Sequence, residues 1–134
     1  MEPASIALYP TPEQLEALLA GPADQPVVML NLLRFKARGD APDDDVSGED
    51  AYRRYMADML PFIAERGARV LWSGVVNTQV IGKDAAGFHH AALVEYPSRK
   101  IFVEIATSPQ VQRFGVHRAA GLEGQWLLAT TTDT

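Results

Sequence analysis

Three polar residues interrupt apolar segments of this sequence, and they are the positions where chemistry is easiest to place. Asn31 lies within the apolar run Val27–Phe35, and Arg118 lies within the apolar stripe of a predicted helix, directly after His117. A buried amide or guanidinium needs a hydrogen-bonding partner. Each residue is therefore either an anchor in the core or a polar group that points into a ligand pocket.

The side chains limit what each residue could do. Arg118 could bind a substrate carboxylate through two parallel hydrogen bonds, or form a structural ion pair with an acceptor such as Glu95. His117 could act as a general acid or base, because histidine exchanges protons near neutral pH, although a surface histidine is the simpler interpretation. Asn31 could orient a ligand or hold a neighbouring loop.

Aromatic residues could supply the apolar wall of such a pocket. The candidates are Phe35, Tyr52, Tyr55, Trp72 and Tyr96. Packing in the core or in a dimer interface is the simpler explanation for most of them. We predict the following substrate-binding residues and assign no catalytic residue: Asn31, Trp72, Tyr96, His117 and Arg118.

The sequence offers little for metal or cofactor chemistry. It contains no cysteine, which excludes disulfides, thiolate nucleophiles and cysteine-ligated metals. His89 and His90 point to opposite faces of a predicted strand and cannot form one site. The acidic run 43–48 begins like a calcium loop, but Arg54 stands where a bidentate glutamate is required, so we interpret the run as a solvated loop. We expect no metal and no cofactor.

Length and composition indicate one folded domain over residues 1–134. The chain is 47% hydrophobic and carries a net charge of −5. The acidic balance argues against binding to nucleic acid. No apolar run reaches the roughly 18 residues that cross a membrane, and the N-terminus has no secretory signal, so we expect a cytoplasmic protein.

Caps and hydrophobic periodicity predict the elements that position these residues. Thr11 and Pro12 begin an N-terminal helix over residues 11–21. The next elements are a strand over 27–35 that is apolar on both faces, a helix over 47–67 that Pro61 kinks or ends early, and strands over 68–81 and 88–96 joined by a turn. Helical pieces begin at Ser98 and Ser108, and a last strand covers 125–130.

After the first helix the order is β-α-β-β-α-β, which predicts a ferredoxin-like α+β fold. This fold has a four-stranded antiparallel sheet with both helices on one face, and its first and third strands are central. The core spans about residues 24–130.

Two helices cover only one face of such a sheet. Strand periodicity predicts that Val70, Trp72, Val76 and Val80 share a face, and the first strand is apolar on both sides. An exposed patch of that size is larger than monomers normally carry. We therefore expect a homodimer with two-fold symmetry. The alternative is that the N-terminal helix covers the open face within one chain.

Several blocks of sequence resemble a known family over about residues 24–130. They are Pro26–Lys36, Tyr52–Met56, Arg69–Trp72, Leu93–Arg99 and His117–Leu122. In this order the blocks resemble a bacterial family of unknown function that belongs with the dimeric α+β barrels. The resemblance implies a ferredoxin-like protomer whose sheets pair into a barrel, with pockets between sheet and helices.

That superfamily includes cofactor-independent monooxygenases, haem-degrading enzymes, lactone isomerases and dye-decolorising peroxidases. The resemblance brings no established catalytic residue, and fold alone is weak evidence for a reaction. We expect a small-molecule-binding protein, with a metal-free oxygenase-like or isomerase-like activity on an apolar or aromatic anionic compound as the first hypothesis. The alternatives are a non-catalytic ligand-binding or accessory dimer, and an interaction protein with a filled interior.

Overall fold

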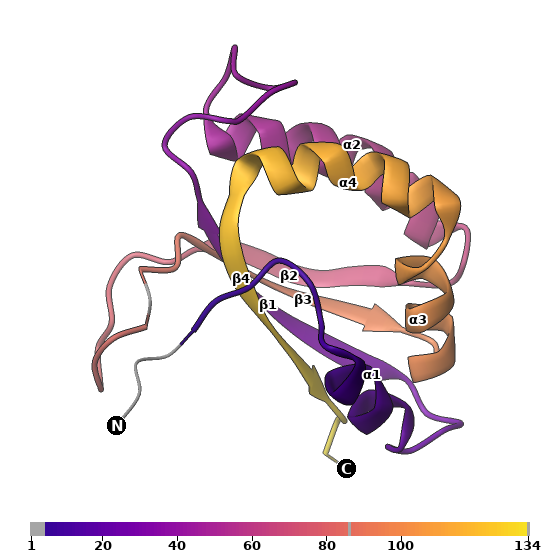
Figure 1. Cartoon of the computed structure of the whole chain (residues 1–134). Coiled ribbons are helices and arrows are strands. Elements are labelled where there is room, and N and C mark those ends of the chain that lie inside the picture. The colour runs from indigo at the N-terminus through magenta and orange to yellow at the C-terminus, as the bar shows by residue number, and fades with distance from the viewer. Residues whose placement is uncertain (1–4, 86, 134) are drawn as a thin grey trace.

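The computed structural model describes residues 5–85 and 87–133. Over these residues the chain forms a sheet with helices packed against one side (Figure 1). The elements in chain order are α1 (Pro12–Leu19), β1 (Val27–Phe35), α2 (Gly48–Ala64), β2 (Arg69–Val75), β3 (His90–Tyr96), α3 (Arg99–Ala106), α4 (Pro109–Gly121) and β4 (Leu122–Thr130). No helix in the described ranges is long and apolar enough to cross a membrane.

The sheet has the strand order β2-β3-β1-β4, and each neighbouring pair is antiparallel. α2 joins β1 to β2, and α3 with α4 joins β3 to β4. Each crossover therefore skips one strand, which is the ferredoxin-like arrangement. The predicted fold class and the central positions of β1 and β3 are confirmed.

Local sequence determines where the helices begin and where α2 ends. The side chains of Ser47, Ser98 and Ser108 accept hydrogen bonds from backbone N–H groups at the first turns of α2, α3 and α4. Thr11 begins α1 with a reciprocal capping box. α2 continues through Pro61 to Ala64, so proline does not end it early, and the segment closes at Gly67, which adopts a φ of 85°.

β2 differs from the prediction in length and in register. It ends at Val75, although the sequence pattern extends to residue 81. A bulge between Val70 and Trp72 makes Val70 pair with Val94 but Trp72 pair with Leu93. The prediction that Val70 and Trp72 share a face is wrong, because one extra residue inverts the alternation beyond the bulge.

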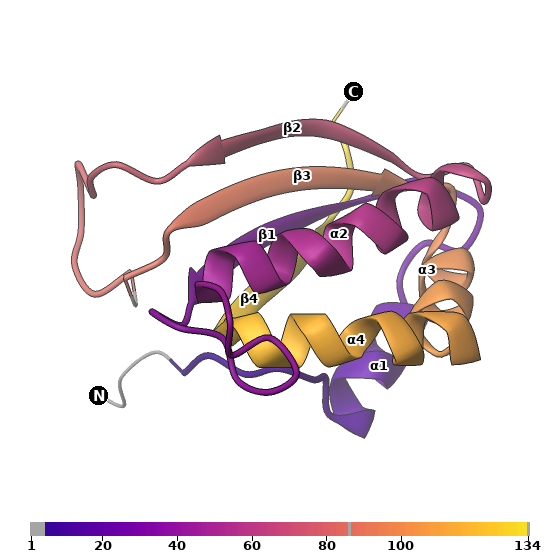
Figure 2. The same cartoon turned by 90° about the horizontal axis from the view of Figure 1, so that it is seen from above.

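The two faces of the sheet have different surroundings. The helices lie on one side of the sheet (Figure 2). Val27, Met29 and Val94 pack in the core with residues of α2, and the alternate residues of the strands face the other side of the sheet. We call this second side the open face; those of its larger apolar residues that are not buried are Leu30, Leu32, Trp72, Leu93, Trp126 and Leu128. α1 lies on the helix side next to α3, so it does not cover the open face.

Two glycines let α2 and α4 meet. A Cβ at Gly48 would lie 2.6 Å from the carbonyl oxygen of Gly121, and one at Gly121 would lie 2.3 Å from that of Gly48. The end of β1 joins them, because Lys36 N–H donates to the Gly121 carbonyl at 2.8 Å. The start of α2, the end of α4 and the end of β1 are therefore fixed in direct backbone contact.

We expect Gly121→Ala to destabilise the protein by about 1–3 kcal/mol, because the added methyl group overlaps the backbone of Gly48. Gly115→Ala in the same helix is the matched control, since nothing lies within 4 Å of a Cβ there. That change should stabilise the helix by up to about 1 kcal/mol. Urea unfolding of both variants checks this; equal unfolding free energies would contradict the close-contact argument.

Candidate functional site

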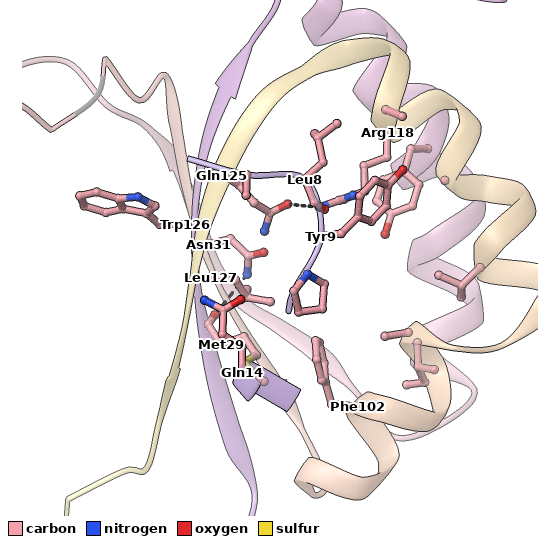
Figure 3. Close-up of a pocket in the computed structure, with 18 of the residues that line it drawn as sticks. Leu8, Tyr9, Gln14, Met29, Asn31, Phe102, Arg118, Gln125, Trp126 and Leu127 are labelled. Atoms are coloured by element: carbon pink, nitrogen blue, oxygen red, sulfur yellow. Dashed lines mark hydrogen bonds between the residues drawn. The ribbon is translucent and has the colours of Figure 1, made fainter. Parts of the chain in front are cut away.

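A cleft of about 1500 Å³ lies between the helix-covered face of the sheet, α2, α3, α4 and the N-terminal residues 5–11 (Figure 3). Its walls are apolar for the most part, with a few polar groups. Small-molecule sites usually occupy about 300–1,000 Å³. The cleft therefore has room for a ring-bearing ligand together with water.

Arg118 carries the positive charge at the centre of the cleft. It extends from α4 toward the N-terminal segment, where Nη2 donates to the carbonyl of Leu8 and, at 2.8 Å, to Oε1 of Gln125. The ring of Tyr9 lies 5.5 Å from its guanidinium carbon. Among the described residues no carboxylate pairs with Arg118, and Nη1 and Nε have no hydrogen-bond partner. The guanidinium thus keeps free donors and an unneutralised charge.

The predicted alternative for Arg118, an ion pair with Glu95, does not occur. Glu95 lies opposite Val28 on the open face and pairs with Arg69 at 3.1 Å. The sheet itself separates the two residues, because successive strand residues point to opposite sides.

Three tyrosines form the polar part of the wall that faces Arg118. Tyr52 and Tyr55 come from α2 with ring centroids 5.4 Å apart, and Tyr96 comes from the end of β3. Within the described part of the chain none of the three hydroxyls has a hydrogen-bond partner. None is fully enclosed either, so their oxygen atoms open into the cleft. A bound ligand or water must supply their hydrogen bonds.

The surroundings keep these hydroxyls protonated. Burial raises the pKa of Tyr52 and Tyr96 far above the ordinary range of tyrosine and also raises the pKa of Tyr55. The positive charge of Arg118 opposes the rise in pKa at Tyr52 and Tyr55. At neutral pH the cleft therefore presents neutral hydroxyl donors beside a cation.

Other polar groups of the cleft are already bonded within the chain. Asn31 donates to its own strand at the Met29 carbonyl, at 3.3 Å, and its amide faces the cleft. The other charged residues of the described lining are Arg99, which donates to the Pro22 carbonyl, and Asp40, which pairs with Lys36. The lining carries more positive than negative charge, although the whole chain is acidic.

The cleft contains three of the five residues predicted to bind substrate. Asn31, Tyr96 and Arg118 line it together, whereas Trp72 and His117 lie elsewhere. The bulge in β2 turns Trp72 to the open face, where its side chain is half exposed. Whether the three lining residues bind a substrate stays a prediction.

His117 is held by an acidic loop. Its Nδ1 lies 2.7 Å from Oδ2 of Asp43, and Arg54 Nη1 donates to the other oxygen of that carboxylate at 2.6 Å. Asp43 is 1% exposed, so the predicted solvated loop is wrong at this residue. Burial raises the pKa of Asp43, but its bonds to His117 and Arg54 outweigh that effect and hold the pKa below the ordinary value. The loop is thereby fastened to α2 and α4, and its residues Asp40 and Ala41 reach the edge of the cleft.

Sequence reasoning named Tyr52 and Tyr55 as possible pocket residues but left them out of the predicted site. Their spacing of three places them on one face of α2, and that face also carries the buried Met59. Because the same pattern describes an ordinary core stripe, only the missing partners of the hydroxyls distinguish the two roles.

These observations define the class of the protein. A sheet in the order β2-β3-β1-β4, with crossover helices on one side and a cleft beneath them, makes it a ferredoxin-like α+β protein. Residues 43–132 match the family described as Domain of unknown function (DUF1330), and the chain belongs to this family. No curated protein matches the sequence.

Solved structures support the same classification. A protein of unknown function from Rhodopseudomonas palustris is 30% identical with a TM-score of 0.87, and the match covers 97% of this chain and 99% of that one. A hydroxynitrile lyase from Passiflora edulis is 16% identical (TM-score 0.57, 82% and 95% covered). A dimeric ferredoxin-like protein of unknown function from Bacteroides fragilis is 14% identical (TM-score 0.50, 83% and 100% covered). The last two show the shared fold alone.

We expect Asp43→Asn to cost about 2 kcal/mol of unfolding free energy at pH 7, because the charge-assisted bonds to His117 and Arg54 are weakened. The contribution of Asp43 is present above about pH 3.9 and disappears as pH falls through its lower pKa in the folded protein. Urea titrations should therefore show wild type and variant converging in acid. Asp44→Asn is the control; an equal loss in it would contradict a specific role for Asp43.

Proposed function

We propose that the protein binds a small carboxylate with an aromatic or other flat apolar body in this cleft. The observation that carries the proposal is the unneutralised guanidinium of Arg118 beside three protonated tyrosine hydroxyls without protein partners. A buried or half-buried cation favours a bound anion, and the free N–H groups at Nη1 and Nε can each donate a charge-assisted hydrogen bond to a carboxylate.

The residues of α4 that line the cleft support one orientation of this ligand along the helix. Val111, Gly115 and Arg118 follow one another at helical spacing along the wall of the cleft. At a rise of 1.5 Å per residue, the apolar wall extends about 10 Å from Arg118 to Val111. No atom lies within 4 Å of a Cβ built on Gly115, so this stretch is open space. With its carboxylate bound to Arg118, a ligand of one or two rings would have those rings beside Gly115.

Catalysis on the bound anion is the second candidate. The tyrosines are proton donors, and Arg118 could stabilise negative charge that develops on a substrate. A ferredoxin-like relative, the hydroxynitrile lyase, is an enzyme, but fold alone does not transfer an activity. Oxygenase-like and isomerase-like reactions also need a general base, and the carboxylate in the described lining, Asp40, is already paired with Lys36. Ligand binding is therefore the better supported function.

We also propose that two copies pair through the open face. Leu30, Leu32, Leu93 and Leu128 form a continuous apolar surface there, and Leu128 is 48% exposed. The charges at its edges are paired within the chain, as in Arg34 with Glu123 at 2.8 Å. Two identical surfaces therefore meet without net repulsion, and one ferredoxin-like relative is described as dimeric.

1-Naphthoate should bind the wild-type cleft more tightly than the neutral 1-naphthalenemethanol. Arg118→Gln should weaken 1-naphthoate about 10–100-fold, because a charge-assisted pair is lost, and Gly115→Leu should abolish binding by filling the space beside α4. Isothermal titration calorimetry measures both. Arg113→Gln, an exposed position of the same helix, is the control; an equal loss there, or tight binding by Gly115→Leu, would refute the site.

The affinity for 1-naphthoate should stay constant from about pH 6 to pH 9. The tyrosines remain neutral donors over this range because burial raises the pKa of each, and His117 lies outside the cleft. A titration series across these pH values checks this. A fall in affinity centred near pH 6.5 would assign the binding to a histidine instead.

Leu128→Asp should convert the proposed dimer into a 14.6 kDa monomer, because it places a charge in the apolar interface. Leu60→Asp on α2 is the matched control, since Leu60 is 41% exposed but lies on the helix side. Sedimentation velocity distinguishes the two species. Wild-type protein that sediments as a monomer at micromolar concentration would contradict the pairing.

A further inference from the structure

We propose that residues 76–85 and 87–89, which we call the arm, contact the partner subunit through Val80 and Ile81. The inference rests on the homodimer proposed above and adds a second contact to it. The arm follows β2, extends beyond the ends of the strands and returns into β3 (Figures 1 and 2).

The tip of the arm exposes apolar side chains to an unusual degree. Val80 is 85% exposed and Ile81 is 89% exposed, while Val75 and Val76 at the root of the arm are 70% and 37% exposed. Single exposed apolar residues are common, but a consecutive group on a projecting loop indicates a contact surface.

The tip is held in shape by its own hydrogen bonds. Oε1 of Gln79 accepts from the Ala85 N–H at 3.2 Å, and Nε2 of Gln79 donates to the Ile81 carbonyl at 3.1 Å. Gly82 adopts a φ of 84°, which glycine permits without strain, and so allows the turn. Because Gln79 already restrains the loop that displays Val80 and Ile81, a contact there costs less conformational entropy.

The root of the arm is continuous with the open face. Phe88, which is 6% exposed, packs against Trp126 with ring centroids 4.9 Å apart. Trp126 belongs to β4, two strands away from β3, and it points away from the cleft (Figure 3). The root of the arm therefore lies against one end of the open face, beside any molecule that covers this face.

A second copy of this chain is the occupant that fits. The open face has paired charges at its edges, and the turn of the arm carries one Lys83 and one Asp84, whose charges cancel. Without a basic cluster, an anionic lipid surface gains no electrostatic attraction from this tip. Two-fold pairing of open faces brings two arms to one dimer, so the contact made by the tip occurs twice.

The test compares dissociation constants of the dimer by sedimentation equilibrium. The double change Val80→Ser and Ile81→Ser should raise the dissociation constant about tenfold or more, because four apolar side chains per dimer lose their contact. Lys83→Ser, at the same tip, should leave it unchanged. An unchanged constant in the double variant overturns the proposal for the arm while leaving the sheet pairing intact, whereas a monomeric wild type overturns both.

A second measurement locates the contact directly. The natural sequence has no cysteine, so Ile81→Cys creates a single attachment point for benzophenone maleimide. Illumination should give a covalent dimer in good yield, and Leu60→Cys should not. Failure to cross-link at Ile81→Cys, or binding of wild type to phosphatidylglycerol vesicles that the double serine change abolishes without affecting the dimer, would overturn the proposal.

Discussion

The backbone contact between Gly48 and Gly121 sets the geometry on which the rest of the molecule depends. It leaves no room for a side chain at either residue, and the Gly121 carbonyl also accepts the N–H of Lys36. Arg118 precedes this contact by one helical turn, and Tyr52 follows it by one. The guanidinium and the tyrosine rings therefore face one another because two helices touch where they have no side chains. Farther along α4, open space remains beside Gly115 in the wall of the cleft.

The two faces of the sheet have different surroundings, because successive residues of a strand point to opposite faces. In β1, Asn31 faces the cleft while its neighbours Leu30 and Leu32 face the open side. Arginine and tyrosine line the cleft, whereas leucine and tryptophan lie on the open face, which has paired charges at its rim. A ligand and a partner subunit would thus act on opposite sides of the same backbone.

The sequence predicted most of the fold because local signals and element order agree. The bounds of β1 were predicted to the residue, and the serine and threonine caps lie where the helices begin. Asn31, Tyr96 and Arg118 were predicted at one site and do line one cleft. Asn31 and Arg118 were found for the same reason: an amide or guanidinium within an apolar stripe is rare enough to stand out.

The errors arise where a distant contact decides the outcome. Nothing in the sequence around Val70 and Trp72 marks the bulge that moves the indole to the other face. The sequence around Asp43 indicates a solvated residue, because its two partners, Arg54 on α2 and His117 on α4, are distant in the chain. The cleft tyrosines have the spacing of a core stripe, and their lack of partners is visible only in three dimensions.

The division of the sheet also separates the chromophores of the protein. Both tryptophans, Trp72 and Trp126, lie on the open face, and all four tyrosines line the cleft. Indole emission therefore reports on whatever covers the open face, and phenol absorbance reports on the contents of the cleft. Without any added label, two optical signals from one chain follow two separate events, assembly and ligand occupancy.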